Sequence, residues 1–126
     1  MSDVTLIKVE AVVREEAFVD VKNALSEIGV NGLTAYQVVG CGAQRGVRHY
    51  IRGQEFEAQV VPKIKFEVVV SSEEWEKKTI DVIKKVAFTG HHGDGKIFSY
   101  DIRQAVKIRT GDTGYDAIQT LKDEED

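Results

Sequence analysis

The spacing of hydrophobic residues predicts a strand followed by a helix in the first part of the chain. Residues 4–13 are mostly β-branched or apolar, which favours a strand with at least one buried face. Further apolar residues recur at helical spacing and predict one amphipathic helix: Phe18, Val21, Ala24, Leu25 and Ile28. Gly29 follows this stripe and predicts the helix end, because glycine readily adopts the left-handed conformation of a C-cap.

The middle of the chain predicts two more strands separated by a long connection. A second strand fits residues 33–39, and a third fits residues 63–70, where apolar and polar side chains alternate. Between Gly40 and about Val60 the periodicity is lost, because glycines interrupt a segment rich in basic residues. Loops of this length in a compact domain are usually functional or disordered, so we expect a flexible connection over residues 41–60.

The last part of the chain predicts a second helix and a fourth strand. Ser71 followed by Glu74 has the capping-box pattern that begins a helix, and apolar residues then recur at helical spacing: Trp75, Thr79, Ile83 and Val86. A glycine-rich turn over residues 89–95 leads into a strand over residues 96–105. A basic turn over residues 107–111 and a tail over residues 112–126, which ends in acidic residues, complete the chain.

The order strand, helix, strand, strand, helix, strand predicts an α+β fold of the ferredoxin-like type. That fold has a four-stranded antiparallel sheet with both helices on one face, here with the long loop between the second and third strands. The 126 residues, of which 42% are hydrophobic, suit a single domain over residues 1–126. This fold hosts many functions, so the function must be sought in the loops.

The charge and composition exclude several classes of protein. A net charge of −4 gives no general attraction to nucleic acid or to an anionic membrane. No stretch approaches the roughly 20 apolar residues that cross a bilayer, and the first residues lack the apolar segment of a signal peptide. Cys41 is the only cysteine, which excludes an internal disulfide and fits a reducing compartment. We therefore expect a cytoplasmic protein that neither binds nucleic acid nor inserts into membranes.

The strongest candidate for binding chemistry is the segment TGHHGDGKIF over residues 89–98. Closely spaced glycines let successive backbone N–H groups converge on an anion, and Lys96 adds a positive charge. The segment is not a P-loop, because Ile97 stands where Ser or Thr should follow the lysine. It therefore predicts phosphate binding without a built-in hydrolysis apparatus, while an ordinary helix-to-strand turn is the alternative that the glycines leave open.

Further polar candidates lie after the last strand and in the long connection. In an extended segment Lys107 and Arg109 would point the same way and could hold phosphates, although a solvated pair of charges is the simpler interpretation. Gln44 offers an uncharged oxygen to a hard cation such as Mg²⁺. Lys63 offers an ammonium group to a carboxylate.

Taken together, several separated segments resemble the PII family of nitrogen-regulatory signal-transduction proteins. In chain order they are GCGAQRG at residues 40–46, RGQE at 52–55, PKIK at 62–65, TG at 89–90 with GDGKIF at 93–98, and IRTG at 108–111. The match covers the chain from about Thr5 to Gly111. Agreement of so many motifs in the correct order argues against a chance match.

The resemblance implies a homotrimer that binds ATP or ADP in the clefts between subunits. It gives phosphate contacts to Gly93, Gly95 and Lys96 of one subunit and to Lys107 and Arg109 of the next. Other residues of the implied nucleotide-binding set are Thr34, Glu67, Thr89 and Asp94.

The resemblance also implies effectors and a partner, with no cofactor and no catalytic residue. Gln44 matches the ligand of a nucleotide-bound Mg²⁺, and Lys63 matches the partner of a 2-oxoglutarate carboxylate. Residues 41–60 correspond to the family's T-loop, whose ligand-dependent rearrangement changes the fit to a partner. Arg52 stands at the position that enters an ammonium channel in some members; another transporter or a metabolic enzyme is equally compatible. We therefore expect a regulator and not an enzyme.

Three departures from the family pattern affect regulation. Phe56 replaces the tyrosine that many bacterial members modify, and its ring has no hydroxyl to accept a nucleotidyl group. Gln54 replaces a serine that some members phosphorylate, so we expect control by ligand alone. Ala43 and Lys107 replace two arginines that can grip phosphate bidentately, which predicts an altered gap between ATP and ADP affinity, in favour of ADP.

Two alternatives stay open on the sequence. One is a sensor on the same scaffold that answers another metabolite, such as bicarbonate, or a transporter regulator that prefers ADP or AMP. The other is a slow nucleotide hydrolase, for which the available bases are Glu55, Glu67 and Asp94.

Overall fold

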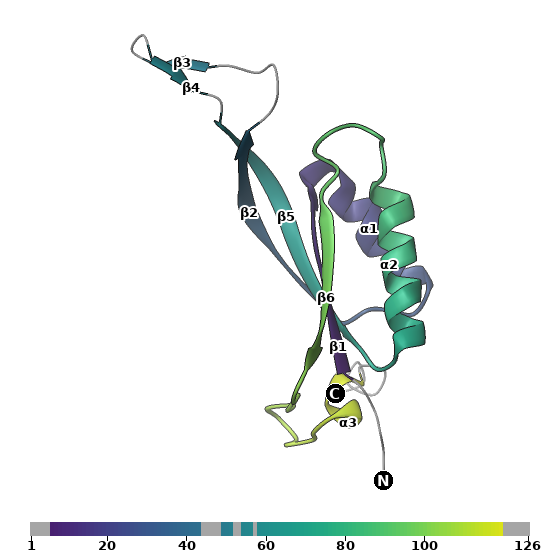
Figure 1. Ribbon diagram of the computed structural model, residues 1–126. Helices are drawn as coiled ribbons and strands as arrows, with labels where there is room; N and C mark the ends of the chain where they lie inside the picture. Colours follow the sequence, from purple (N-terminus) through teal and green to yellow (C-terminus); the bar gives the residue numbers. More distant parts are fainter. Residues whose placement is uncertain (1–5, 44–48, 52–53, 57, 120–126) are drawn as a thin grey trace.

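The computed structural model describes residues 6–43, 49–51, 54–56 and 58–119, which form a four-stranded sheet with its two long helices on one face (Figure 1). Its strands are β1 (Leu6–Arg14), β2 (Leu33–Ala43), β5 (Ala58–Val70) and β6 (Lys96–Ile102), in the order β2-β5-β1-β6. Each neighbouring pair is antiparallel. The helices are α1 (Phe18–Glu27), which follows a 3₁₀ turn at Glu15–Ala17, and α2 (Glu73–Ala87). The predicted ferredoxin-like α+β fold is confirmed.

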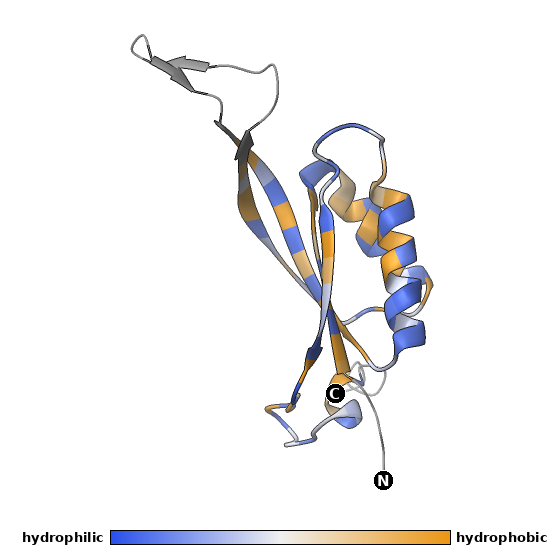
Figure 2. Ribbon diagram, viewed as in Figure 1, coloured by the Kyte–Doolittle hydropathy of each residue, from blue (hydrophilic) through white to orange (hydrophobic). Residues whose placement is uncertain are grey.

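The core lies between the helices and the face of the sheet that they cover. Alternate residues of β1 point into it and are almost completely buried: Ile7, Val9, Ala11 and Val13. Phe66 of β5 and Val21, Leu25 and Ile83 of the helices complete the cluster. Figure 2 shows the same alternation of hydrophobic and hydrophilic residues along β5. None of the described helices is long and apolar enough to cross a membrane.

The end of α1 follows the sequence prediction. Gly29 has a φ of 95°, and its N–H donates to the carbonyl of Ser26 at 3.0 Å. The N–H of Val30 donates to the carbonyl of Leu25 at 2.8 Å. These two bonds form a Schellman motif, so the helix ends where glycine permits a left-handed residue.

The start of α2 corrects the sequence prediction by one residue. The N-cap is Ser72 and not Ser71, because the Ser72 hydroxyl accepts a hydrogen bond from the Trp75 N–H at 3.1 Å. Glu74 therefore lies one position before the place that a capping box requires, and the predicted box does not form. Either serine has the right chemistry, and only the path of the chain out of β5 selects between them.

The strands beside the predicted long loop extend further than their periodicity indicated. β2 runs to Ala43 and β5 begins at Ala58, so the two strands continue as a ribbon beyond the rest of the sheet (Figure 1). Gly40 lies inside β2 opposite Val61, because pairing with β5 satisfies its backbone groups. Between the two strands, β3 (His49–Ile51) pairs with β4 (Gln54–Phe56) as a separate two-stranded sheet.

The sheet face opposite the helices carries a polar and aromatic network. Its ion pairs join Lys8 to Glu67 and Lys65 to Glu10, each at 3.3 Å. Tyrosine hydroxyls donate to the same two carboxylates, from Tyr36 to Glu67 at 3.0 Å and from Tyr100 to Glu10. The hydrogen bond from Tyr100 is the main reason why the pKa of Glu10 lies below its ordinary value. No described helix covers this face, and we call it the open face.

Candidate functional site

The glycine-rich turn between α2 and β6 lies unusually close to β1. Gly95 has a φ of 108°, and a Cβ at this residue would lie 1.9 Å from the carbonyl oxygen of Val12. No L-residue with a side chain fits there, because both the backbone conformation and the space exclude a Cβ. The next residue, Lys96, then begins β6 opposite Val12. The glycine therefore positions the lysine at the start of the strand.

Asp94 holds the turn from inside. Its carboxylate accepts hydrogen bonds from the N–H groups of Thr89 at 2.7 Å and Gly90 at 3.0 Å, and from the Thr89 hydroxyl. Arg14, at the end of β1, adds an ion pair at 3.6 Å. The Thr89 hydroxyl bond and these amide bonds lower the pKa of Asp94 to about 2. Asp94 and Thr89 thus position the turn.

Because its pKa is lowered on folding, Asp94 stabilises the fold only while it is ionised. This contribution is fully present above the ordinary pKa of 3.8 and is lost as the pH falls through about 2. We expect Asp94→Asn to be less stable than the wild type at pH 7, with a gap that shrinks between about pH 4 and pH 2. Urea unfolding across this pH range measures the gap, and a gap that stays constant would contradict the role of the ionised carboxylate.

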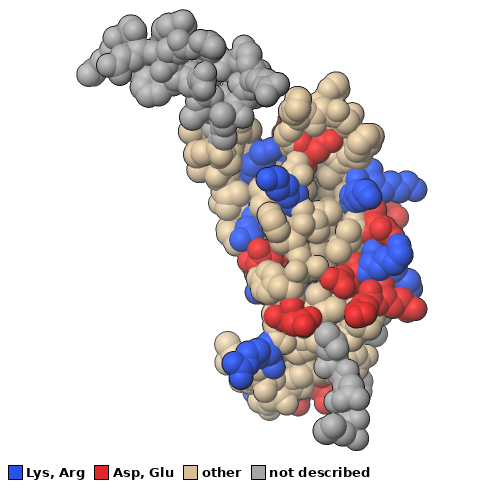
Figure 3. Space-filling model, in the orientation of Figure 1, with Lys and Arg blue, Asp and Glu red and all other residues tan. Residues whose placement is uncertain are grey.

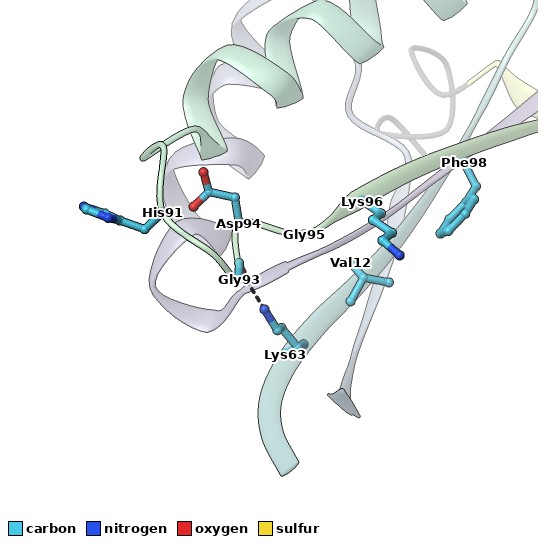
Figure 4. A pocket seen from close by; sticks show the side chains of 8 residues that line it. All are labelled: Val12, Lys63, His91, Gly93, Asp94, Gly95, Lys96 and Phe98. Atoms are coloured by element: carbon cyan, nitrogen blue, oxygen red, sulfur yellow. Dashed lines mark hydrogen bonds between the residues drawn. The ribbon is translucent and has the colours of Figure 1, made fainter. Parts of the chain in front are cut away.

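A hollow of about 500 Å³ lies beside the turn, and four elements contribute to it (Figure 4). We refer to it as the turn hollow; its lining residues are Val12, Lys63, His91, Gly93, Asp94, Gly95, Lys96 and Phe98. Figure 3 shows basic side chains between the ribbon and the turn, with acidic atoms beside them on the side of the turn. Two ammonium groups beside a glycine backbone and two apolar side chains suit an anion attached to a flat apolar group.

Lys63 is tied directly to the turn. Its ammonium group donates to the carbonyl oxygen of Gly93 at 2.5 Å, as the dashed line in Figure 4 shows. Lys63 lies on β5 at the base of the ribbon, opposite Val38 of β2. Lys63 therefore links the base of the ribbon to the turn.

The structure brings together five of the residues that the sequence singled out. Lys63, Gly93, Asp94, Gly95 and Lys96 all line the turn hollow. Of the other lining residues, His91 and Phe98 belong to the segment over residues 89–98 but were given no individual role, and sequence reasoning missed Val12 altogether. Strand alternation could have found Phe98, since it lies two residues after Lys96 and shares its face of the sheet.

Thr34 and Glu67 lie together but away from the turn hollow. Thr34 of β2 pairs directly with Glu67 of β5, and Glu67 lies four residues along β5 from Lys63. That separation corresponds to roughly 13 Å. Glu67 makes its contacts within the network of the open face.

Lys107 and Arg109 lie at the opposite end of β6 from Lys96, and the basic turn that the sequence predicted over residues 107–111 is confirmed. The extended conformation that would point both side chains the same way does not form. Residues 107–111 form a turn, which the N–H of Gly111 closes by donating to the carbonyl of Lys107 at 2.8 Å. Neither side chain lines the turn hollow. The strand between them and Lys96 spans seven residues, so one chain cannot bring these cations to the same phosphate group.

Comparison with known proteins assigns this arrangement to a family. Residues 6–112 match the family model described as nitrogen regulatory protein P-II. The chain belongs to the P-II family. The nitrogen regulatory protein P-II 1 of Methanothermobacter thermautotrophicus is 44% identical over 114 residues, which are 90% of this chain and 98% of that protein.

Two solved structures of P-II proteins share the fold. The complex of B. subtilis GlnK with ATP has a TM-score of 0.75 and 38% identity over 90% of this chain and 95% of that one. Arabidopsis thaliana PII bound to citrate has a TM-score of 0.73 and 34% identity over 93% of each chain. Two other expected P-II site residues, Gln44 and Arg52, fall outside the described part of this chain.

Proposed function

We propose that this P-II protein binds ATP or ADP between the subunits of a homotrimer and thereby regulates a partner protein. The observation that carries the proposal is that four basic side chains lie in two groups, near opposite ends of β6. Lys63 and Lys96 converge on the turn hollow, whereas Lys107 and Arg109 lie at the far end of the strand. A second copy of the chain would bring the two groups together around one phosphate chain. The GlnK neighbour, which was solved as an ATP complex, supports the choice of ligand.

The open face supports self-association. It exposes aromatic side chains on β2 and β6, with Tyr36 42%, Phe98 53% and Tyr100 45% exposed. Both tyrosine hydroxyls and both carboxylates of its network are already paired within the subunit. Covering this face with other copies would therefore bury aromatic area without leaving those polar groups unpaired.

The ribbon provides a route from ligand to partner. Lys63 lies at its base and contacts the turn, and its far end, at Ala43 and Ala58, belongs to the expected T-loop, residues 41–60. An anion in the turn hollow competes with the Gly93 carbonyl for the Lys63 ammonium group, so ligand and ribbon are coupled.

In this proposal Gln44 ligates a nucleotide-bound Mg²⁺, Lys63 binds a carboxylate of 2-oxoglutarate, and Arg52 contacts the partner in the cytoplasm. The partner is an ammonium channel, another transporter or a metabolic enzyme.

Regulation accounts for the site better than nucleotide hydrolysis does. The carboxylate of Asp94 is occupied by amides of its own turn. That of Glu67 is occupied by Lys8 and Tyr36 on the open face. Asp94 lines the turn hollow but both of its oxygens already accept hydrogen bonds, and Glu67 lies away from the hollow, so neither is available to orient a water molecule there. The side chain of the third candidate base, Glu55, lies outside the described part of the chain.

Calorimetry combined with light scattering tests the proposal. We expect a trimer that binds ATP and ADP at one site per chain, with ADP bound at least as tightly as ATP because Ala43 and Lys107 offer no guanidinium groups. Nucleotide at 100 times its Kd should stabilise each site by about 2.7 kcal/mol and raise the Tm. A monomer that binds no adenine nucleotide at millimolar concentration would refute the proposal. Nucleotide binding without an effect of 2-oxoglutarate would instead favour a sensor of another metabolite.

A further inference from the structure

The ammonium group of Lys107 is held by the chain that follows it. Its Nζ donates to the carbonyl oxygen of Gln119 at 3.2 Å, in a half-buried contact. Gln119 directly follows the short helix α3 (Tyr115–Ile118). Carbonyl groups at a helix end lack partners within the helix and attract cations. Lys107 is also one of the cations on which the proposed phosphate site depends.

The backbone brings Gln119 to this position. The N–H of Gly114 donates to the carbonyl of Ala105 at 3.0 Å, and Val106 and Thr113 form an isolated β-bridge. Gly114 then turns the chain with φ 61° and ψ −134°, a conformation that is open essentially to glycine alone. The N–H of Ala117 donates to the carbonyl of Gly114 at 3.0 Å and begins the helix. Residues 114–119 therefore fold back in a defined way.

We propose that residues 114–119 act as a built-in competitor that occupies Lys107 and weakens nucleotide binding until it is displaced. The proposal rests on the proposed function, because it assumes that Lys107 contacts phosphate in a neighbouring subunit. A neutral carbonyl binds an ammonium group less strongly than a phosphate does, so nucleotide displaces the segment at sufficient concentration. The apparent affinity falls as the fraction of chains in which the segment leaves the Lys107 ammonium group accessible to phosphate falls. Nucleotide binding and the folded-back conformation of residues 114–119 are thereby linked.

Two substitutions release the segment without changing a charge. Gly114→Ala disfavours the turn through the backbone alone, because a Cβ there would have no heavy atom within 4 Å. Ala117→Pro removes the N–H that begins α3. We expect each variant of the full chain to bind ATP about three- to tenfold more tightly than the wild type in calorimetry.

A double-mutant cycle with Lys107→Met separates this effect from a general change in the fold. In the Lys107→Met background, neither Gly114→Ala nor Ala117→Pro should change the Kd for ATP, since there is no ammonium group left to release. Unchanged or weaker ATP binding in both single variants would overturn the inference, as would the same gain with and without Lys107. If wild type and all variants fail to bind ATP or ADP at millimolar concentration, the proposed function itself is wrong.

Discussion

Gly95→Ala should lower the free energy of unfolding by about 3–5 kcal/mol, which is a large part of the stability of a domain of this size. Two penalties add. A left-handed φ of 108° costs a residue with a side chain about 1–2 kcal/mol. In addition, the new Cβ would lie 1.9 Å from the Val12 carbonyl oxygen, so the turn or β1 must move. β1 has little freedom to move, because it is paired on both sides in the middle of the sheet.

Gly93→Ala is the matched control for this experiment. Gly93 has a comparable φ of 99°, but a Cβ there would meet only the end of the Lys63 side chain, at 3.7 Å. We expect it to cost about 1–2 kcal/mol, from the backbone conformation alone. Urea unfolding of the two variants compares them directly. Equal losses would show that the close approach of Gly95 to β1 has no importance for stability.

Lys96→Met should weaken ATP and ADP binding by about 10- to 100-fold with little effect on folding. The ammonium group is exposed at the start of β6 and makes no hydrogen bond or ion pair with the described part of the chain, so its loss should change stability by no more than about 0.5 kcal/mol. A charge-assisted hydrogen bond to phosphate contributes about 1.5–3 kcal/mol, which sets the expected loss of affinity. Calorimetry gives the Kd, and urea unfolding checks that the fold is intact.

Lys84→Met provides the control for charge alone. Lys84 is exposed in the last turn of α2 and does not line the turn hollow. The variant has the same net charge as Lys96→Met and should bind nucleotide with a Kd close to that of the wild type. If both substitutions weakened binding equally, a general electrostatic effect would explain the result, and the turn hollow would not be the phosphate site.

These predictions separate residues that shape the turn from Lys96, the residue that we propose contacts the ligand. Gly95 and Asp94 act on the turn itself, through the space beside β1 and through hydrogen bonds to Thr89 and Gly90. Changing either should alter stability and binding together. Lys96 uses the position that they create, so its substitution should alter binding alone.

The sequence predicted the elements and the place of the glycine-rich turn because both are encoded locally. The alternation along β1, the helical stripes and the glycine after α1 determined element types whatever their partners. The glycine cluster followed by Lys96 indicated an anion site in the same way. Element boundaries were less certain: Ser72 capped α2 in place of Ser71, and Gly40 stayed within β2, because the path of the chain and strand pairing decided them.

What only the tertiary structure decided is which distant residues meet. Local patterns identified Lys63 and Gly93 separately, but their contact needs β5 and the turn to be placed beside each other by the sheet order. Val12 carried no signal as a site residue, since its role comes entirely from lying opposite Lys96. The contact of Lys107 with Gln119 likewise depends on a backbone turn at Gly114 that no periodicity encodes. The sequence by itself determined the kinds of groups available, whereas three-dimensional packing determined their neighbours, because contacts between distant residues depend on the whole chain.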